Sequence, residues 1–401
     1  MTIPIAPKET SPAEATRPRL RLEFLDGLRG LAAFYIVLFH GCQGVVLDDD
    51  HVNNDMIYRF GHAAVSIFIV LSGFCLMLPV VRSGDGRLRG GAAEYLKRRA
   101  WRIVPPYYAA LLLGMLLLVG GHLARFRSSA ALHDKVMAMH LSAGSVISHL
   151  LLVHNFSKRW VETIDVPMWS VATEWQIYFL FPLVLLPVWR RFGGLAALTC
   201  GFALGLLPHY LLAPGRNFDW ACPWYAGLFA MGMVGALVAF SPPPAAVAWR
   251  ERLPWVSIAM LLFSLWGVLN VLMPNGWVDP RIWVTDALMG SATACLILHG
   301  AVHATKSPTS PRPWMLQVLE SQPVLQLGMF SYSLYLVHYP ILNKIALLLW
   351  ARHLPLAERL IGIYALGVPL AVGLSYLFYL AFEKPFVVRL TSTRPAETVL
   401  R

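Results

Sequence analysis

Long apolar runs separated by short polar stretches dominate the pattern along the chain. Each run approaches the roughly 20 residues that a helix needs to cross the hydrocarbon core of a bilayer. The alternating ten-residue pattern of a membrane β-barrel strand is absent. The pattern predicts ten membrane-spanning helices, at residues 28–46, 63–81, 105–121, 169–189, 194–213, 222–240, 254–273, 282–303, 325–349 and 359–382.

The expected fold class is therefore all-α, a polytopic membrane helix bundle of about ten transmembrane helices. Residues 28–382 are expected to form the membrane domain, with 1–27 as an N-terminal tail and 383–401 as a C-terminal tail. The first span is expected to act as the insertion signal, because no apolar stretch of a cleavable signal peptide precedes it. Segment 141–155 is interpreted as a candidate interfacial or re-entrant segment.

Composition supports a membrane protein. Hydrophobic residues make up 57% and charged residues 14% of the chain, whereas a soluble domain carries about 25% charged residues. The net charge of +11 comes from Lys and Arg placed between apolar spans. This placement indicates topology signals and contacts with membrane lipids, and no nucleic-acid partner is expected.

The basic residues also predict an orientation. With the N-terminus in the cytoplasm, segments on that side hold 21 Lys and Arg, against 10 on the other side when Arg359 at a span edge is included. Cytoplasmic loops carry the excess of Lys and Arg. Both termini are therefore expected in the cytoplasm, which requires an even number of spans.

Arg29 and His40 lie within the first span, where polar side chains are costly and usually mark function. Eleven residues correspond to about three helical turns and about 16 Å, so both side chains share one helix face. A histidine can take a proton from a hydroxyl and return it later. The alternative is a histidine hydrogen-bonded between helices.

Glu174 is the second costly residue, early in the fourth span. A buried carboxylate needs a partner, and an arginine or histidine from another helix is expected. The alternative role is a structural ion pair that fixes helix packing. Further polar side chains lie along this stretch and in a later span: Trp169, Ser170, Tyr178 and His338.

Arg99 and Arg102 lie at helical spacing before Pro105, which is expected to end their segment. Guanidinium groups bind phosphates bidentately. A dock for a phosphorylated donor is one interpretation, and a positive-inside loop touching anionic lipid is the other. No metal is expected, because His299 and His303 lie four apart without an evident third ligand.

Six motifs in order resemble the acyltransferase-3 family, across residues 25–386. They are LDGLRGLAAFYIVLFH (25–40), GHAAVSIFIVLSGF (61–74), RRAWRIVPPYY (98–108), MWSVATEWQIYFLFPL (168–183), MFSYSLYLVHYPIL (329–342) and FEKP (382–385). Val171 and Ile177 depart from the usual residues of the fourth motif. Neither departure affects polar chemistry.

The resemblance implies an integral membrane O-acyltransferase, in the inner membrane of a bacterium. Acetyl-CoA is the implied donor, without a metal, and the implied acceptor is a hydroxyl of a surface or exported glycan or of a lipid-linked sugar. His40 is then a general base or a transient acyl carrier, with Arg29 orienting the donor or polarising the thioester. Glu174 is expected to orient His40 or stabilise its protonated form.

The remaining residues follow from the same resemblance. Arg99 and Arg102 are expected to hold the phosphates of acyl-CoA, and the acceptor is expected to contact Trp169, Ser170, Tyr178 and His338. His40 and Glu174 are expected to line one internal cavity that connects to Arg99 and Arg102. Two other function classes stay open: a transporter or flippase for a lipid-linked sugar, and a structural partner of a polysaccharide export complex.

Overall fold

The computed structural model describes residues 22–46, 54–83, 85–123, 141–211, 217–240, 247, 250–273, 279–304 and 312–387. Regular structure within these ranges is helical, without a strand. Ten of the helices described are long and apolar enough to cross a membrane, which confirms the predicted number of spans. They are Glu23–Val45, Phe60–Arg82, Gly91–Gly120, Met168–Phe192, Gly194–Leu211, Asp219–Phe240, Trp255–Leu272, Ile282–Ala304, Ser331–Ala351 and Leu356–Val387.

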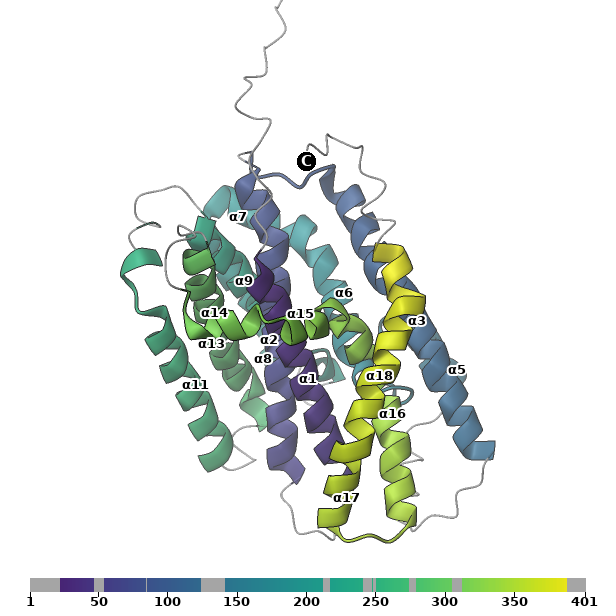
Figure 1. Cartoon of the computed structure of the whole chain (residues 1–401). Coiled ribbons are helices and arrows are strands. Elements are labelled where there is room, and N and C mark those ends of the chain that lie inside the picture. The colour runs from purple at the N-terminus through teal and green to yellow at the C-terminus, as the bar shows by residue number, and fades with distance from the viewer. Residues whose placement is uncertain are drawn as a thin grey trace, which may run out of the picture.

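The helices form one bundle around α1 (Figure 1). Helix α1 packs against α2 on one side and α16 on the other, and α2 carries α9 and α13 on its far side. The bounds are α1 Glu23–Val45, α2 Asn54–Arg82, α3 Gly91–Leu123, α6 Met168–Leu180, α8 Gly194–Leu211, α9 Tyr225–Phe240, α11 Trp255–Leu272, α13 Ile282–Ala304, α16 Ser331–Ala351, α17 Leu356–Gly362 and α18 Val368–Phe378. Shorter helices link these: α5 Ala143–Leu150, α7 Leu186–Phe192, α14 Trp314–Leu319 and α15 Gln322–Met329.

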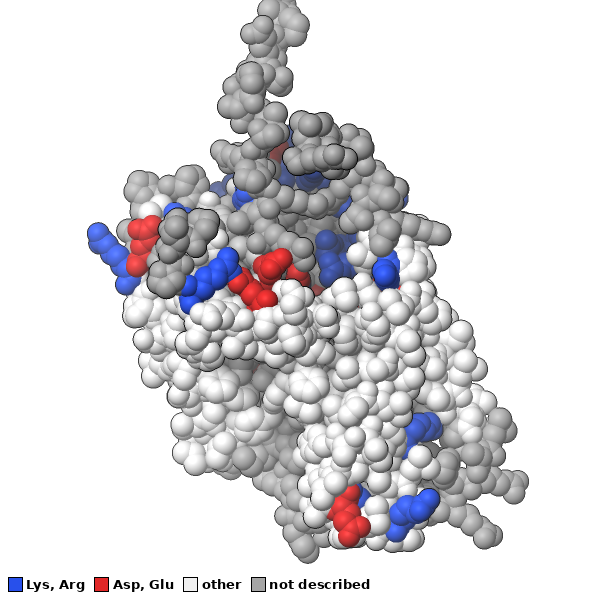
Figure 2. Space-filling view, viewed as in Figure 1, with Lys and Arg blue, Asp and Glu red and all other residues white. Residues whose placement is uncertain are grey.

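Charged side chains gather at the two ends of the bundle, and the broad band between them is almost free of charge on the face shown in Figure 2. Such a band is what the hydrocarbon core requires of a lipid-facing surface. The chain is therefore an integral, multi-pass membrane protein.

Glycines let α2 and α9 approach until their backbones touch. A Cβ atom added to Gly73 would lie 2.0 Å from the carbonyl oxygen of Phe229, and one added to Gly232 would lie 2.0 Å from that of Val70. Small residues at such crossings give membrane helices their packing contacts, because lipid supplies little hydrophobic force between helices. This contact fixes α2, which contributes to both cavities described below.

The prediction that Pro105 ends its helical segment is wrong. Helix α3 runs unbroken from Gly91 to Leu123 with Pro105 inside it. Prolines are tolerated in membrane helices where neighbouring helices, side chains or water satisfy the backbone groups that they leave free. Arg99 therefore belongs to a spanning helix rather than to a loop.

The ninth span begins at Ser331 rather than at residue 325, because the chain breaks at Phe330 between α15 and α16. The Glu383 carboxylate accepts hydrogen bonds from the Ser333 amide at 3.1 Å and the Ser333 hydroxyl at 2.5 Å. A carboxylate at a helix N-terminus satisfies unpaired amides and complements the helix dipole. Glu383 of the FEKP motif (382–385) thus caps α16, the helix that carries His338.

The interfacial or re-entrant role expected for residues 141–155 stays a prediction, and the segment before α6 has a buried polar side and an exposed apolar side. Helix α5 exposes Ile147 and Leu150 and buries Ser148 and His149. Such a helix presents apolar side chains to lipid and polar ones to protein. Non-helical backbone at membrane depth is tolerated only when protein covers it, and Asn155, which follows α5, is fully buried.

Candidate active site

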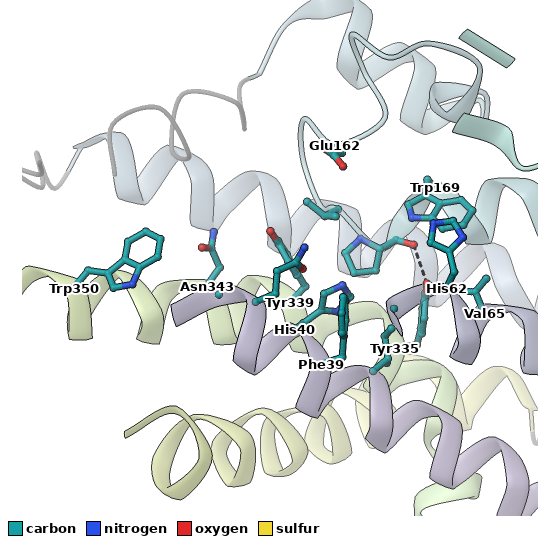
Figure 3. A pocket seen from close by; sticks show the side chains of 16 residues that line it. Phe39, His40, His62, Val65, Glu162, Trp169, Tyr335, Tyr339, Asn343 and Trp350 are labelled. Carbon is teal, nitrogen blue, oxygen red and sulfur yellow. Dashed lines mark hydrogen bonds between the residues drawn. The ribbon is translucent and has the colours of Figure 1, made fainter. Parts of the chain in front are cut away.

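A first cavity of about 230 Å³, the histidine cavity, lies among α1, α2, α16 and the segment that leads into α6. Figure 3 shows His40 and Tyr339 on one side and His62 and Trp169 together at the other, with Glu162 above them. The ring centroids of His62 and Trp169 are 5.6 Å apart. The cavity therefore offers imidazole groups beside aromatic faces.

A second cavity of about 310 Å³, the arginine cavity, lies among α1, α2, α3, α6 and α16. It brings together residues from five distant parts of the sequence. Its polar lining includes Arg29, Ser72, Arg99, Arg102, Ser170, Glu174, Tyr178, Ser331, Tyr332 and Tyr335.

His40 is hydrogen-bonded to His338, with its Nδ1 2.8 Å from Nε2 of His338. The other nitrogen of His338, Nδ1, lies 2.9 Å from the carbonyl oxygen of Leu334. A carbonyl only accepts, so neutral His338 carries its proton on Nδ1 and accepts at Nε2. His40 must then carry its proton on Nδ1, which leaves the Nε2 lone pair to accept a proton from a substrate hydroxyl.

Glu174 has a different partner from the expected one. The Tyr178 hydroxyl donates to Glu174 Oε1 at 2.5 Å, and Ser72 lies 3.1 Å from the same hydroxyl. Glu174 lines the arginine cavity, whereas His40 lines the histidine cavity. The expected orientation of His40 by Glu174 is therefore replaced by the pairing with His338.

The arginine cavity carries positive charge that its own residues do not neutralise. Arg29 pairs with Asp26 at 3.0 Å and donates to the Cys75 sulfur at 3.0 Å. Arg99 and Arg102 form no ion pair with a described carboxylate, and the buried Nε of Arg99 has no hydrogen-bond partner among the described residues. Arg99 is half-buried and Arg102 is exposed where it lines the cavity. Guanidinium groups bind anionic oxygens such as those of phosphates bidentately, so the cavity fits an anionic ligand.

The expectation of one cavity holding both His40 and Glu174 is wrong. The two cavities share Val65 and Tyr335 as lining residues, so they flank the same point of the bundle. Arg29 and His40 lie on one helix but face different cavities.

The predicted acceptor residues fall on both cavities. Trp169 lines the histidine cavity, and Ser170 and Tyr178 line the arginine cavity. His338 is fully buried behind His40 and lines neither. His338 is therefore placed to position His40 rather than to touch a substrate.

Sequence reasoning missed a histidine–carboxylate pair at the histidine cavity. His62 Nδ1 lies 3.6 Å from Asp286 Oδ2. The same carboxylate accepts hydrogen bonds from Ser66 at 3.0 Å and Trp224 at 2.8 Å. Asp286 is a charged residue inside a predicted span, so the cost argument applied to Glu174 also singles it out.

Polar groups are buried between α5 and α6. The rings of His149 and His154 stack with centroids 3.8 Å apart. Asp165 is fully buried, and neither of its carboxylate oxygens has a hydrogen-bond partner among the described residues. Burial raises the pKa of Asp165 well above its usual range and lowers the pKa of His149 to about 4.

Candidate metal ligands do not come together in the described part of the chain: no group of three or more His, Cys, Asp or Glu could hold an ion there. His303 Nδ1 lies 2.9 Å from the carbonyl oxygen of His299, its own helix neighbour.

The fold and the two cavities define a multi-pass membrane enzyme whose polar site lies inside the helix bundle. The family model described as acyltransferase domain, the acyltransferase-3 family, matches residues 22–380. The chain belongs to this family and is an acyltransferase.

Among curated relatives, acyltransferase MdmB of Streptomyces mycarofaciens is 26% identical over 81% of this chain and 80% of its own length. O-acetyltransferase OatA of Staphylococcus aureus is 25% identical over 80% of this chain. The match spans about half of OatA, at 51% of its length. No solved structure matches the chain.

Proposed function

We propose that the protein transfers an acyl group, acetyl in the simplest case, from acyl-CoA to a hydroxyl of a surface or exported glycan or of a lipid-linked sugar. The acyl-CoA phosphates bind in the arginine cavity, at Arg99 and Arg102, from the cytoplasmic side. The acceptor hydroxyl binds in the histidine cavity, where His40 removes its proton. The membrane concerned is the inner membrane of a bacterium.

One observation carries the proposal: a cavity with excess positive charge adjoins a cavity with a basic histidine nitrogen. The first suits a phosphorylated donor, and the second suits a hydroxyl that must lose a proton. The name of OatA, an O-acetyltransferase, supports a hydroxyl acceptor and an acetyl group. The aromatic faces of Trp169 and Tyr339 suit the apolar side of a sugar ring.

The opposite placement of donor and acceptor is tested with sealed inside-out vesicles that contain the protein. Radiolabelled acetyl-CoA is added outside, and we expect CoA thiol release together with labelled glycan in the lumen. A transporter would release no CoA thiol. Labelled product confined to the outside would contradict transfer across the membrane, although it would leave acyl transfer itself intact.

A further inference from the structure

Tyr335 lies at the point where the two cavities meet. It is one of two residues that line both cavities, and the other, Val65, has no polar side-chain atom. The ring of Tyr335 makes an edge contact with Phe68, at 5.8 Å between centroids. Its hydroxyl is therefore the one polar side-chain group among the described residues that both cavities share.

The hydroxyl of Tyr335 belongs to a crowded group of hydrogen bonds at the start of α6. It lies 2.6 Å from the Ser170 hydroxyl. It also lies 3.2 Å from the Pro167 carbonyl oxygen, the contact drawn as a dashed line at Tyr335 in Figure 3. The Pro167 oxygen also lies 3.1 Å from Ser170 Oγ and 3.3 Å from the Ser170 amide. Three donors thus approach one carbonyl oxygen with two lone pairs, so the Tyr335 proton can be redirected at low cost to another acceptor.

The reaction requires such an acceptor at this point. If the acyl-CoA phosphates bind at Arg102 and the acceptor hydroxyl binds at His40, the thioester carbon must reach the boundary between the cavities. Its carbonyl oxygen then gains negative charge as the acceptor attacks. A positioned hydrogen-bond donor aimed at that oxygen stabilises the transition state more than the ground state.

We propose that Tyr335 is a further catalytic residue, whose hydroxyl donates to the thioester carbonyl oxygen; the proposal rests on the function proposed above. The acceptor oxygen bonds to the carbonyl carbon while its proton passes to His40 Nε2. The resulting oxyanion accepts the hydrogen bond from Tyr335. Its collapse restores the carbonyl, breaks the carbon–sulfur bond and expels the CoA thiolate, which takes the proton from His40.

The primary test compares Tyr335→Phe with the unaltered protein in proteoliposomes. The variant keeps the ring and its contact with Phe68, so we expect folding and donor binding to be retained. We expect kcat to fall by about 10²–10³-fold with the KM for acetyl-CoA unchanged. Tyr107→Phe is the matched control, because Tyr107 is fully buried, donates to the His149 carbonyl at 3.0 Å and lines neither cavity.

A spectroscopic test does not depend on turnover. Acetyl-CoA labelled with ¹³C at the carbonyl is bound to His40→Ala, which cannot complete the reaction. We expect its infrared carbonyl band to move to lower wavenumber on binding, and to move less in the double variant with Tyr335→Phe. Equal bands in both variants, or a Tyr335→Phe enzyme with full kcat, would overturn the inference.

Fluorotyrosine at position 335 gives a readout should Tyr335→Phe fail to fold, because ring fluorination changes the acidity of the hydroxyl and little else. We expect kcat to follow that acidity, and an unchanged kcat would contradict a role at the oxyanion. Failure of the proposed function gives a different result from failure of the role proposed for Tyr335. In that case the unaltered protein itself binds no labelled acetyl-CoA and releases no CoA.

Discussion

His40 on α1 and His338 on α16 lie 298 residues apart in sequence, with 2.8 Å between Nδ1 of the first and Nε2 of the second. The Leu334 carbonyl holds the tautomer of His338, and His338 in turn holds that of His40. The base of the proposed reaction is thus oriented by a neutral imidazole, where hydrolytic triads use a carboxylate. A neutral partner suits a site inside the membrane, because an additional buried charge is costly there.

We expect His40→Ala to abolish transfer while the protein stays folded and inserted. A general base contributes about 10²–10⁴-fold in rate, and the substitution removes it. CoA release from acetyl-CoA in proteoliposomes measures the loss. Full activity of a well-expressed His40→Ala variant would exclude His40 as base and as acyl carrier.

We expect His338→Leu to lower kcat by about 10²-fold, the scale of a misplaced catalytic group, with little change in the KM for acetyl-CoA. The leucine removes the acceptor that fixes His40. In His338→Gln the amide oxygen can still accept from His40, so part of the rate should return. Steady-state kinetics of both variants provide the measurement.

A matched control for His338 exists in α13. His303 bonds the carbonyl of His299 four residues earlier at 2.9 Å, the same local geometry as His338 with Leu334. His303→Leu should therefore leave kcat unchanged. Equal losses in the glutamine and leucine variants of His338 would show that position 338 matters for packing alone.

Much of the fold follows from hydrophobicity. The ten spans are predicted because the hydrocarbon core sets both the length and the polarity of each helix. Arg29, His40 and Glu174 were found in the sequence by the same reasoning, since polar groups in spans are costly. The structure places all three on internal cavities.

The pairing of these residues was not predictable in the same way. Which helix faces His40 depends on how spans 1 and 9 pack, and hydrophobicity does not determine that. The arrangement of two adjoining cavities depends on how α1, α2 and α16 pack, because Val65 of α2 and Tyr335 of α16 line both. The continuation of α3 through Pro105 depends on helices around it, whereas local rules predict an end.

We expect Arg102→Ala to raise the KM for acetyl-CoA while the dependence on acceptor stays nearly unchanged. Arg102 lines the arginine cavity and lacks a described ion-pair partner, so an anionic donor group is its expected partner. Arg102→Lys should restore part of the affinity, because lysine keeps the charge but loses the bidentate geometry. Initial rates over a grid of donor and acceptor concentrations separate the two effects.

The control for Arg102 lies one turn earlier on the same helix. Arg98 pairs with Glu94 at 3.4 Å and does not line either cavity. Arg98→Ala should therefore leave both KM values unchanged. If Arg102→Ala instead changes the KM for the acceptor and leaves the KM for acetyl-CoA unchanged, the arginine cavity binds the acceptor.

We expect Asp165→Asn to stabilise the protein at neutral and alkaline pH. The Asp165 carboxyl is fully buried without a described partner, and burial raises its pKa well above the usual range. The unfolded chain releases this proton near pH 4. Below that pH both states are protonated, and the folded state loses relative stability as the pH rises towards the raised pKa. Asparagine cannot ionise, so this loss disappears.

Thermal unfolding in detergent between pH 4 and pH 8 measures the effect of Asp165→Asn. The variant should unfold about 2–4 °C higher at pH 8 for each kcal/mol gained and show a flatter pH dependence. Asp85→Asn is the control, because hydrogen bonds from Ser83 and the Arg87 amide lower the pKa of this exposed loop residue. Above about pH 5 the Asp85 carboxyl is ionised in both the folded and the unfolded chain. Over that range, the unfolding temperature of Asp85→Asn should therefore change with pH as it does in the unaltered protein. An Asp165→Asn protein that unfolds lower at pH 8 than the unaltered chain would mean that the ionised carboxylate has a stabilising partner.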